Sequence, residues 1–230
     1  MQSLTKNIGK SQAIPQLQKE IEIKRILISR PNHRLGNLLL LTPLVQEVGR
    51  IFPDSKIDLF VKGGISPIIY KNYENIDHFI QLPKKPFSHL FQYIQAWFQL
   101  KSRKYDLAIN ANQGSSSGKL SIQLANSTYK FFGEEDEALN LKYPDYQHDA
   151  KKAIYNLRKY LKDFGINENI EKAPSLKLKL DPDEIETGKI NLKKIVQNDQ
   201  KTICLFTNAT GEKIYSKEWW EVFYNKLKST

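Results

Sequence analysis

Short apolar runs alternate along this chain with longer segments in which apolar residues recur every three or four positions. The short runs are rich in β-branched residues and are typical of buried strands, whereas the longer segments are typical of helices that pack on a sheet. Strands are expected at Lys24–Arg30, Lys56–Val61, His78–Leu82, Tyr105–Ala111 and Tyr129–Phe132. Helices are expected at Asn37–Phe52, Ser66–Tyr73, Ser88–Arg103, Ser117–Leu124 and Tyr146–Phe164. Because parallel strands need crossover helices, the alternation predicts an α/β fold with a largely parallel sheet.

The pattern changes after the long helix that is expected at Tyr146–Phe164. Gly165 suits a helix-ending position, and the polar stretch that follows it contains Pro174. Beyond that stretch we expect a helix from Pro182, a strand at Lys201–Thr207 and a helix at Ser216–Lys228. The predicted organisation is a polar lead (1–23), an N-terminal Rossmann-like domain (24–165), a linker region (166–180) and an incomplete second Rossmann-like domain (181–230).

Composition narrows the classes of protein that the chain can represent. Of its 230 residues 40% are hydrophobic and 11% aromatic, which is enough for a genuine core. No apolar run approaches the ~20 residues of a membrane span. The first 23 residues lack the apolar centre of a secretory signal, so we expect a cytoplasmic protein. A single cysteine, Cys204, excludes an internal disulfide and is interpreted as a buried strand residue.

The net charge of +10 and a pI near 9.4 favour anionic partners such as nucleotide phosphates or acidic lipid headgroups. The other interpretation is a lysine-rich solvated surface. The lysines are scattered and no nucleic-acid motif accompanies them, so nucleic acid is not an expected partner.

Two stretches combine a strand, a polar loop and a helix. In Arg25–Val48 the loop contains a glycine, and in Leu205–Trp220 it contains small residues with a hydroxyl and a lysine. Such loops suit anions because unpaired N–H groups point outward at a helix start. For the second loop the alternative is a plain turn.

Three segments, Arg25–Val48, Phe52–Asp58 and Tyr105–Asn110, resemble in order and spacing the N-terminal domain of family 9 glycosyltransferases. These are the ADP-heptose:lipopolysaccharide heptosyltransferases and their relatives. The loop with Thr210 and Lys213 is similar to the family's donor loop, in which a Thr and a Lys hold the donor diphosphate. The resemblance covers roughly residues 24–228.

This resemblance implies a GT-B fold, in which two Rossmann-like domains face each other across a cleft. It also implies metal-independent, inverting sugar transfer with no cofactor. The donor would be a nucleotide sugar, expected to be ADP-linked, and the acceptor a saccharide or a lipid-linked glycan such as lipopolysaccharide. Thr210, Gly211 and Lys213 would bind the donor diphosphate.

The chain departs from the family at three points. The family's general base is an Asp, but Asn37 stands at that position, and Asn110 replaces another common Asp. Family members also continue past the position of Thr230 and carry a Gly-Pro-x-His-type loop there. An amide cannot accept the acceptor's proton, although it can orient the acceptor by hydrogen bonding.

His33 lies in the same loop and is the natural replacement for the missing base. Imidazole titrates near ~6.5, so it can take up a proton at physiological pH. The other interpretation is a loop histidine that caps backbone groups. Arg34 is expected either to bind a phosphate or acidic acceptor or to be a surface charge.

The acceptor is expected to contact Arg34, Gly36, Asn112, Gln113 and Ser115, from the loops after two strands. The segment Asn112–Lys119 is not a P-loop, because its glycines are one residue too close and Leu120 follows the lysine.

Other patterns have a structural explanation or two competing ones. Asp181-Pro-Asp183 fits a helix cap better than a metal site. His78, His89 and His148 are too dispersed to predict a metal site. The aromatic stripe in Ser88–Lys104 is expected mainly to pack in the core; the alternative, given the basic residues around it, is contact with an anionic membrane.

The expected function is therefore a cytoplasmic, family 9-like glycosyltransferase, with peripheral contact at the inner face of the membrane as an open alternative. A second hypothesis is a non-catalytic remnant that binds an acceptor or a partner. A dinucleotide-dependent oxidoreductase is disfavoured because the Gly-x-Gly-x-x-Gly turn is missing.

Overall fold

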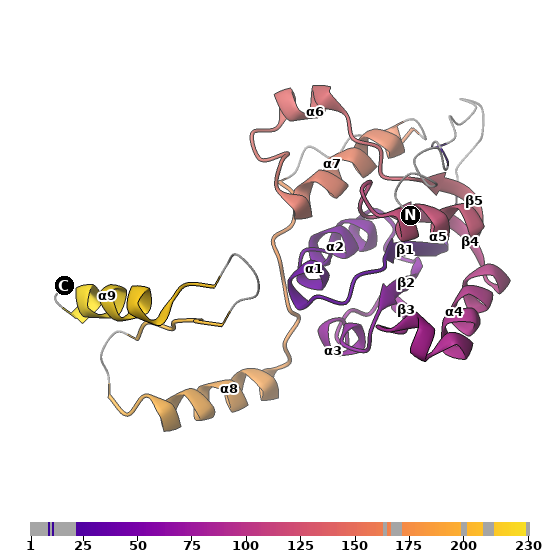
Figure 1. Cartoon of the computed structure of the whole chain (residues 1–230). Coiled ribbons are helices and arrows are strands. Elements are labelled where there is room, and N and C mark those ends of the chain that lie inside the picture. Colours follow the sequence, from indigo (N-terminus) through magenta and orange to yellow (C-terminus); the bar gives the residue numbers. More distant parts are fainter. Residues whose placement is uncertain are drawn as a thin grey trace. The chain divides into compact units, whose positions relative to one another are not determined.

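The computed structural model describes residues 9, 11, 22–162, 165–166, 172–198, 202–208 and 214–228. The chain divides into two compact units, residues 1–180 and 181–230. The described elements, which apart from η1 are labelled in Figure 1, are β1 (Arg25–Arg30), α1 (Leu35–Leu39), α2 (Thr42–Ile51), β2 (Lys56–Lys62), α3 (Ser66–Ile69), β3 (Ile76–Leu82), the 3₁₀ turn η1 (Pro86–Ser88), α4 (Leu90–Ser102), β4 (Lys104–Asn110), α5 (Ser116–Leu124), β5 (Asn126–Phe131), α6 (Glu137–Lys142), α7 (Asp149–Lys162), α8 (Pro182–Ile195) and α9 (Lys217–Lys228).

The first unit is built on a five-stranded sheet in the order β3-β2-β1-β4-β5. Every neighbouring pair is parallel, and at the centre Ile28 lies opposite Leu59 on one side and Ile109 on the other. The strands are short apolar runs joined by helical crossovers, as the sequence pattern requires. The predicted α/β fold with a parallel sheet is confirmed.

Alternation along the strands gives the sheet two apolar faces. On β1, Ile26 and Ile28 belong to the core cluster that includes residues of α2, α3 and α7. Leu27 points to the other face, where it joins residues of α4 and α5. The unit is therefore a three-layer sandwich with the sheet in the middle.

The helix predicted at Asn37–Phe52 is in fact two helices, and that prediction is wrong. Proline 43 lies in the first turn of α2, and α1 ends four residues before it at Leu39. A proline has no N–H to donate, and its ring clashes with the carbonyl four residues earlier, so one continuous helix cannot form. The break places α1 as a separate short turn after β1.

The helix predicted at Tyr146–Phe164 begins later than expected, with α7 starting at Asp149, and α6 precedes it unpredicted. Phe164 lies outside the described residues. Gly165 has a φ of +74°, and the N–H of Ile166 donates to the carbonyl of Leu161 at 3.3 Å. This bond pattern is a helix-ending motif that needs a left-handed residue, as predicted for Gly165.

Helices α2 and α7 are joined by a buried ion pair. The Nε of Arg158 lies 2.7 Å from a carboxylate oxygen of Glu47, and the two side chains are 3% and 0% exposed. Arg50 lies 2.5 Å from the other carboxylate oxygen of Glu47. Charges this deep must be paired, so this contact fixes how the two helices meet.

Part of the predicted linker region is held against the first unit. Ala173 is buried in the core, and the Tyr73 hydroxyl donates to the carbonyl of Lys177 at 2.7 Å. The N–H of Lys177 in turn donates to Thr42 Oγ1 at 3.2 Å.

In the second unit the predicted cap at Asp181 is confirmed. Its carboxylate accepts from the N–H of Glu184, whose own carboxylate accepts from the N–H of Asp181. The predicted strand at Lys201–Thr207 is wrong where it can be judged, because residues 202–208 are exposed and have no regular secondary structure. Cys204 is exposed rather than buried. A strand needs a neighbour for its backbone groups, and the described part of 181–230 contains no other strand.

Among the described residues, no helix combines the length and apolar character needed to cross a bilayer.

Candidate functional site

The predicted site residues of the first unit gather at one edge of the sheet. From β1 the chain moves outward through β2 and β3, and then returns to place β4 on the other side of β1. The loops after β1 and β4 therefore begin at the point where the strand order reverses. This switch point is where open α/β sheets bind ligands. The N–H of Ala111 donates to the carbonyl of Ser29 at 3.0 Å, so the two loops leave the sheet side by side.

The loop after β1 places His33, Arg34 and Gly36 in solvent and half-buries Asn37 in the first turn of α1. No side chain caps this short helix. Within the described part of the chain, the His33 ring has no hydrogen-bond partner, so it does not cap backbone groups there. A Cβ built on Gly63 would lie 3.3 Å from the Cβ of His33, so the histidine lies close to the end of β2.

The loop after β4 contributes Asn112, Gln113 and Ser115, which are all partly buried. The Oγ of Ser115 accepts a hydrogen bond from the N–H of Gly118 at 3.0 Å and caps α5. This bond leaves its hydroxyl proton available to a ligand. Asn112 and Gln113 line a hollow.

Asn110, at a position where the resemblance implies a carboxylate, is buried at the end of β4. Its Nδ2 donates to the carbonyls of Asn112 at 2.9 Å and Phe132 at 2.8 Å. An ionised Asp could make neither bond, because a carboxylate has no proton to donate. The amide at this position therefore ties the loop after β4 to the end of β5.

The hollow beside Asn112 and Gln113 has a volume of about 50 Å³ and is polar. The residues that line it are Asn110, Ala111, Asn112, Gln113, Gly133, Glu135, Asp149, Lys152, Ala153 and Asn156. It brings a carboxylate of α7, Asp149, to the loop after β4. The sequence analysis did not single out Asp149, because nothing local shows that the start of α7 lies over this edge.

Arg30 ends β1 at the same switch point and was also missed. Burial lowers the pKa of its guanidinium, while the negative charge of Asp149 acts in the opposite direction. The only signal for Arg30 in the sequence was its position as the last residue of a predicted strand. A partly buried cation there suits an anionic ligand.

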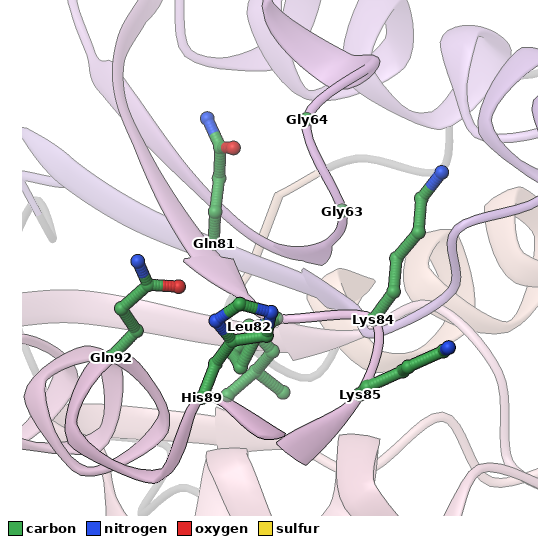
Figure 2. Close-up of a pocket in the computed structure, with 9 residues that line it drawn as sticks. Gly63, Gly64, Gln81, Leu82, Lys84, Lys85, His89 and Gln92 are labelled. Carbon is green, nitrogen blue, oxygen red and sulfur yellow. The ribbon is translucent and has the colours of Figure 1, made fainter. Parts of the chain in front are cut away.

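A larger cavity of about 410 Å³ opens beyond the ends of β2 and β3 (Figure 2). It is lined by Gly63, Gly64, Gln81, Leu82, Pro83, Lys84, Lys85, His89 and Gln92. None of these side chains is acidic, so the cavity favours an anionic group. Gly63 has a φ of +77°, and a Cβ there would lie 2.9 Å from Lys84 Cε, so the turn accepts only glycine without strain.

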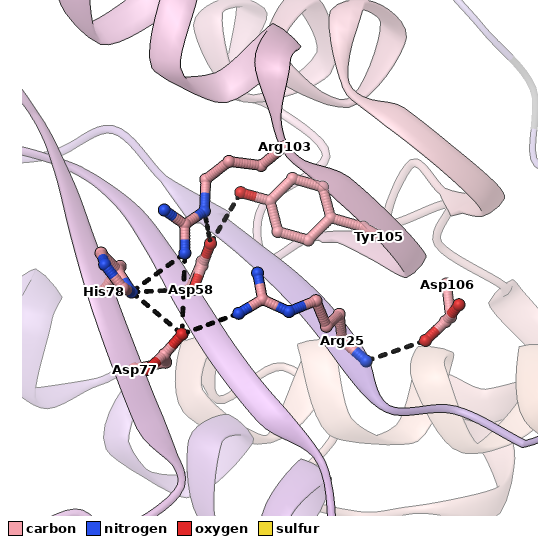
Figure 3. Close-up of polar contacts among 7 residues, drawn as sticks. All are labelled: Arg25, Asp58, Asp77, His78, Arg103, Tyr105 and Asp106. Carbon is pink, nitrogen blue, oxygen red and sulfur yellow. Dashed lines mark hydrogen bonds and ion pairs between the residues drawn. The ribbon is translucent and has the colours of Figure 1, made fainter.

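The opposite edge of the sheet holds an ion-pair network (Figure 3). Asp58 forms an ion pair with Arg103, whose Nε lies 2.7 Å from its carboxylate, and accepts a hydrogen bond from the Tyr105 hydroxyl at 2.8 Å. Asp77 pairs with Arg25 at 3.0 Å. Burial and the Asp58 carboxylate raise the pKa of Tyr105.

His78 completes this network, with its Nδ1 at 2.9 Å from Asp77. Burial opposes ionisation of Asp77, but His78, Arg25 and Arg103 together lower its pKa. Ligand atoms of Asp58, Asp77 and His78 lie within 4.8 Å of one another, which spacing along the sequence had not suggested. Because both carboxylates already face arginines, the network is best explained as a set of structural ion pairs.

The expected donor-binding residues Thr210, Gly211 and Lys213 lie outside the described residues.

Comparison with solved structures identifies the architecture. The chain is similar to the glycosyl transferase family 9 protein from Veillonella parvula DSM 2008, with a TM-score of 0.58 and 17% identity. The match covers 91% of this chain and 62% of that one. The chain has the fold of a family 9 glycosyltransferase. The first unit therefore confirms the Rossmann-like parallel sheet that the expected GT-B-type fold requires in its N-terminal half.

Two structures of the E. coli heptosyltransferase WaaC are also similar. The structure with ADP matches with a TM-score of 0.46 and 16% identity, over 65% of this chain and 50% of that one. The structure with ADP-2-deoxy-2-fluoro heptose matches with a TM-score of 0.43 and 14% identity, over 65% and 51%. No protein-family model and no curated protein matches the chain.

Proposed function

We propose that this chain is the acceptor-side part, with the start of the donor side, of an inverting and metal-independent glycosyltransferase. The enzyme moves a sugar, with heptose as the first candidate, from an ADP-linked or related donor to lipopolysaccharide or another surface glycan. It works in the cytoplasm, in peripheral contact with the inner face of the membrane. The observation that carries the proposal is the pair of polar loops at the switch point of a fold shared with family 9. The chain spans about 62% of the Veillonella protein's length.

In the proposed reaction the acceptor hydroxyl attacks the anomeric carbon from the face opposite the diphosphate. A new carbon–oxygen bond forms while the bond to the phosphate oxygen breaks, and the hydroxyl proton passes to His33. The imidazole suits this step because it is exposed in the loop after β1 and has no hydrogen-bond partner among the described residues. Asn37 lies four residues further along the chain, and its side-chain amide holds and orients the acceptor hydroxyl.

The leaving diphosphate needs positive charge and N–H donors. Lys213, Thr210 and the backbone at Gly211 supply them in this proposal, which rests on the resemblance of their loop to the family's donor loop.

The acceptor contacts Arg34 and the backbone at Gly36 on one side of the switch point, and Asn112, Gln113 and Ser115 on the other. Arg30 adds a partly buried positive charge at the end of β1. This set suits hydroxyl groups and an acidic group on the acceptor, because it combines amide and hydroxyl hydrogen bonding with two guanidinium groups.

A transfer assay with ADP-heptose and a soluble acceptor tests the proposal in the full-length enzyme. His33→Gln should lower kcat by about 100-fold or more, since general base catalysis contributes on that order. Lys213→Ala should lower kcat through loss of leaving-group stabilisation. His78→Gln is the matched control, because this histidine lies at the opposite edge of the sheet.

Asp149→Asn belongs in the same assay, because the Asp149 carboxylate lines the hollow beside Asn112 and Gln113. If Asp149→Asn abolishes transfer and His33→Gln does not, the base is Asp149 and the role of His33 is wrong.

The second candidate function is a non-catalytic acceptor-binding domain, favoured by Asn37 at the position of the family's base. Calorimetry separates the two. Saturable binding of acceptor with no binding of nucleotide sugar would support the non-catalytic domain, and saturable binding of the donor would exclude it.

A further inference from the structure

Helix α4 has a second apolar face that is largely exposed in the described part of the chain. Five large side chains form it, one from the preceding 3₁₀ turn and four from α4. They are Phe87 (97% exposed), Leu90 (58%), Phe91 (80%), Ile94 (58%) and Phe98 (72%). We call this set the α4 apolar stripe. It is far larger than the single exposed apolar residues that are ordinary on protein surfaces.

The stripe differs from the face by which α4 joins the core. The core-facing residues are Tyr93, Ala96, Trp97 and Leu100, and the Trp97 ring lies 5.1 Å from that of Phe60 on β2. At about 100° per residue, the helical members of the α4 apolar stripe fall within an arc of roughly 100° that does not overlap the core-facing arc. The prediction that the aromatics of this helix mainly pack in the core is therefore wrong for half of them.

Positive charge surrounds the stripe. No Asp or Glu occurs between Asp77 and Asp106, whereas Lys84 and Lys85 precede the stripe and Lys101 follows Phe98 by about one turn. These three lysines are exposed. An apolar aromatic face bordered by unopposed lysines is complementary to the headgroup region of an anionic bilayer.

We propose that the α4 apolar stripe and its flanking lysines form a docking surface for an anionic membrane. Phe87, Phe91 and Phe98 enter the boundary between headgroups and acyl chains, and the lysines contact lipid phosphates. A second copy of the chain is a poor occupant, because a symmetric pairing would bring the same lysines together. An anionic bilayer can bury the apolar face in its acyl region and pair the lysines with its phosphates.

The cavity beyond β2 and β3 lies next to this surface and shares Lys84 and Lys85 with it. Through Gly63 the cavity also borders His33. Docking would therefore bring a lipid-linked acceptor to the predicted site from the membrane side. This delivery of the acceptor rests on the proposed function, whereas the docking surface is argued from the exposure and charge of its own residues.

Vesicle sedimentation with the full chain tests the proposal. Vesicles of phosphatidylcholine alone are compared with vesicles that also contain phosphatidylglycerol, at low and high salt. Binding should require phosphatidylglycerol and should weaken as salt rises, because headgroup attraction is screened. Phe91→Ser with Phe98→Ser should weaken binding about ten-fold or more, since two inserted rings are lost.

Two matched controls accompany the variants. Leu141→Ser removes an equally exposed apolar side chain on α6, where Leu141 is 90% exposed, and should leave binding unchanged. Lys84→Glu with Lys85→Glu should abolish anionic selectivity, whereas Lys193→Glu with Lys194→Glu, an exposed pair on α8, should retain it. Far-UV circular dichroism checks that each variant is folded.

Unchanged vesicle binding by folded Phe91→Ser with Phe98→Ser would overturn the proposal. It would also be overturned if the native chain ignored anionic vesicles but formed a dimer that this double substitution dissolved, since the face would then be a self-association surface. Transfer to a soluble acceptor, measured on the same variant in the full-length enzyme, tests the proposed function separately.

Discussion

The side-chain amide of Asn110 donates a hydrogen bond to the backbone carbonyl of Phe132 over 2.8 Å, and so links the end of β4 to the end of β5. A second bond from the same nitrogen reaches the carbonyl of Asn112 at 2.9 Å. This one amide fixes the loop that carries Asn112 and Gln113. Asn110 thus has a structural role in this chain.

Asn110→Asp should destabilise the first unit by about 2–4 kcal/mol, because a buried carboxylate would face two carbonyl oxygens without a proton to share. Urea unfolding at neutral pH measures the change. Asn112→Asp, at a partly exposed position, is the control and should change the free energy of unfolding by less than about 1 kcal/mol. Equal unfolding midpoints for Asn110→Asp and the native chain would show that the hydrogen bonds do not matter.

Glu47→Leu should destabilise the chain by about 3–5 kcal/mol, since it leaves the buried guanidinium of Arg158 without its neutralising carboxylate. Adding Arg158→Met should restore most of this loss, because two apolar side chains can pack together without a desolvation cost. Arg50→Met removes only the more exposed partner and should cost about 1 kcal/mol or less. The prediction is contradicted if the free energies of unfolding lost in Glu47→Leu and Arg158→Met simply add in the double variant.

Trp97→Ala and Phe98→Ala compare the two faces of α4 at adjacent positions. Trp97 packs on Phe60, so its truncation should cost about 2–4 kcal/mol. Phe98 is 72% exposed, so its truncation should cost about 0.5 kcal/mol or less. Thermal unfolding of both variants is the measurement, and a large loss for Phe98→Ala would mean that its ring is buried after all.

Alkaline pH should weaken the packing of α7. Burial and the hydrogen bond to Asp145 raise the pKa of Tyr155 to about 12. The unfolded chain loses this proton near ~10, whereas the folded chain keeps it, so the contribution of Tyr155 is complete below pH ~10 and is lost as pH rises towards 12. Tyr155→Phe removes the titrating hydroxyl but keeps the ring, which stacks on Tyr143 with 4.0 Å between the ring centroids.

The loss of thermal stability between pH 9.5 and 11.5 should therefore be smaller for Tyr155→Phe than for the native chain, as measured over ~2 pH units by calorimetry. Identical losses in both proteins would place the alkaline sensitivity in other tyrosines.

Much of the first unit could be predicted from its sequence because its signals are local. The β-branched runs mark the strands, and the helical spacing between them requires crossovers, so a parallel sheet follows. The position of His33 and Asn37 after one strand and of Asn112 after another also follows from spacing. The helix break before Pro43 could have been predicted by the same local rules, since the proline is visible in the sequence.

Other features could not be predicted because they depend on which elements meet. Nothing in the sequence around Asp149 shows that α7 begins over the end of β4. Likewise, His78 acquires Asp58 as a neighbour only when β2 and β3 pair. The strand expected around Cys204 illustrates the same point in reverse, because a β-prone run forms a strand only where another strand can accept its hydrogen bonds.

The sequence by itself determined the layers of this protein, the order of most of its elements and the loops that lead into the switch point, since backbone propensity and apolar periodicity act over neighbouring residues. Only the tertiary structure decided which faces of those elements are covered. Helix α4 carries apolar residues on two sides, and apolar periodicity along the sequence does not distinguish them. The sheet can bury only one side of a helix, so the packing of α4 decides which residues are covered.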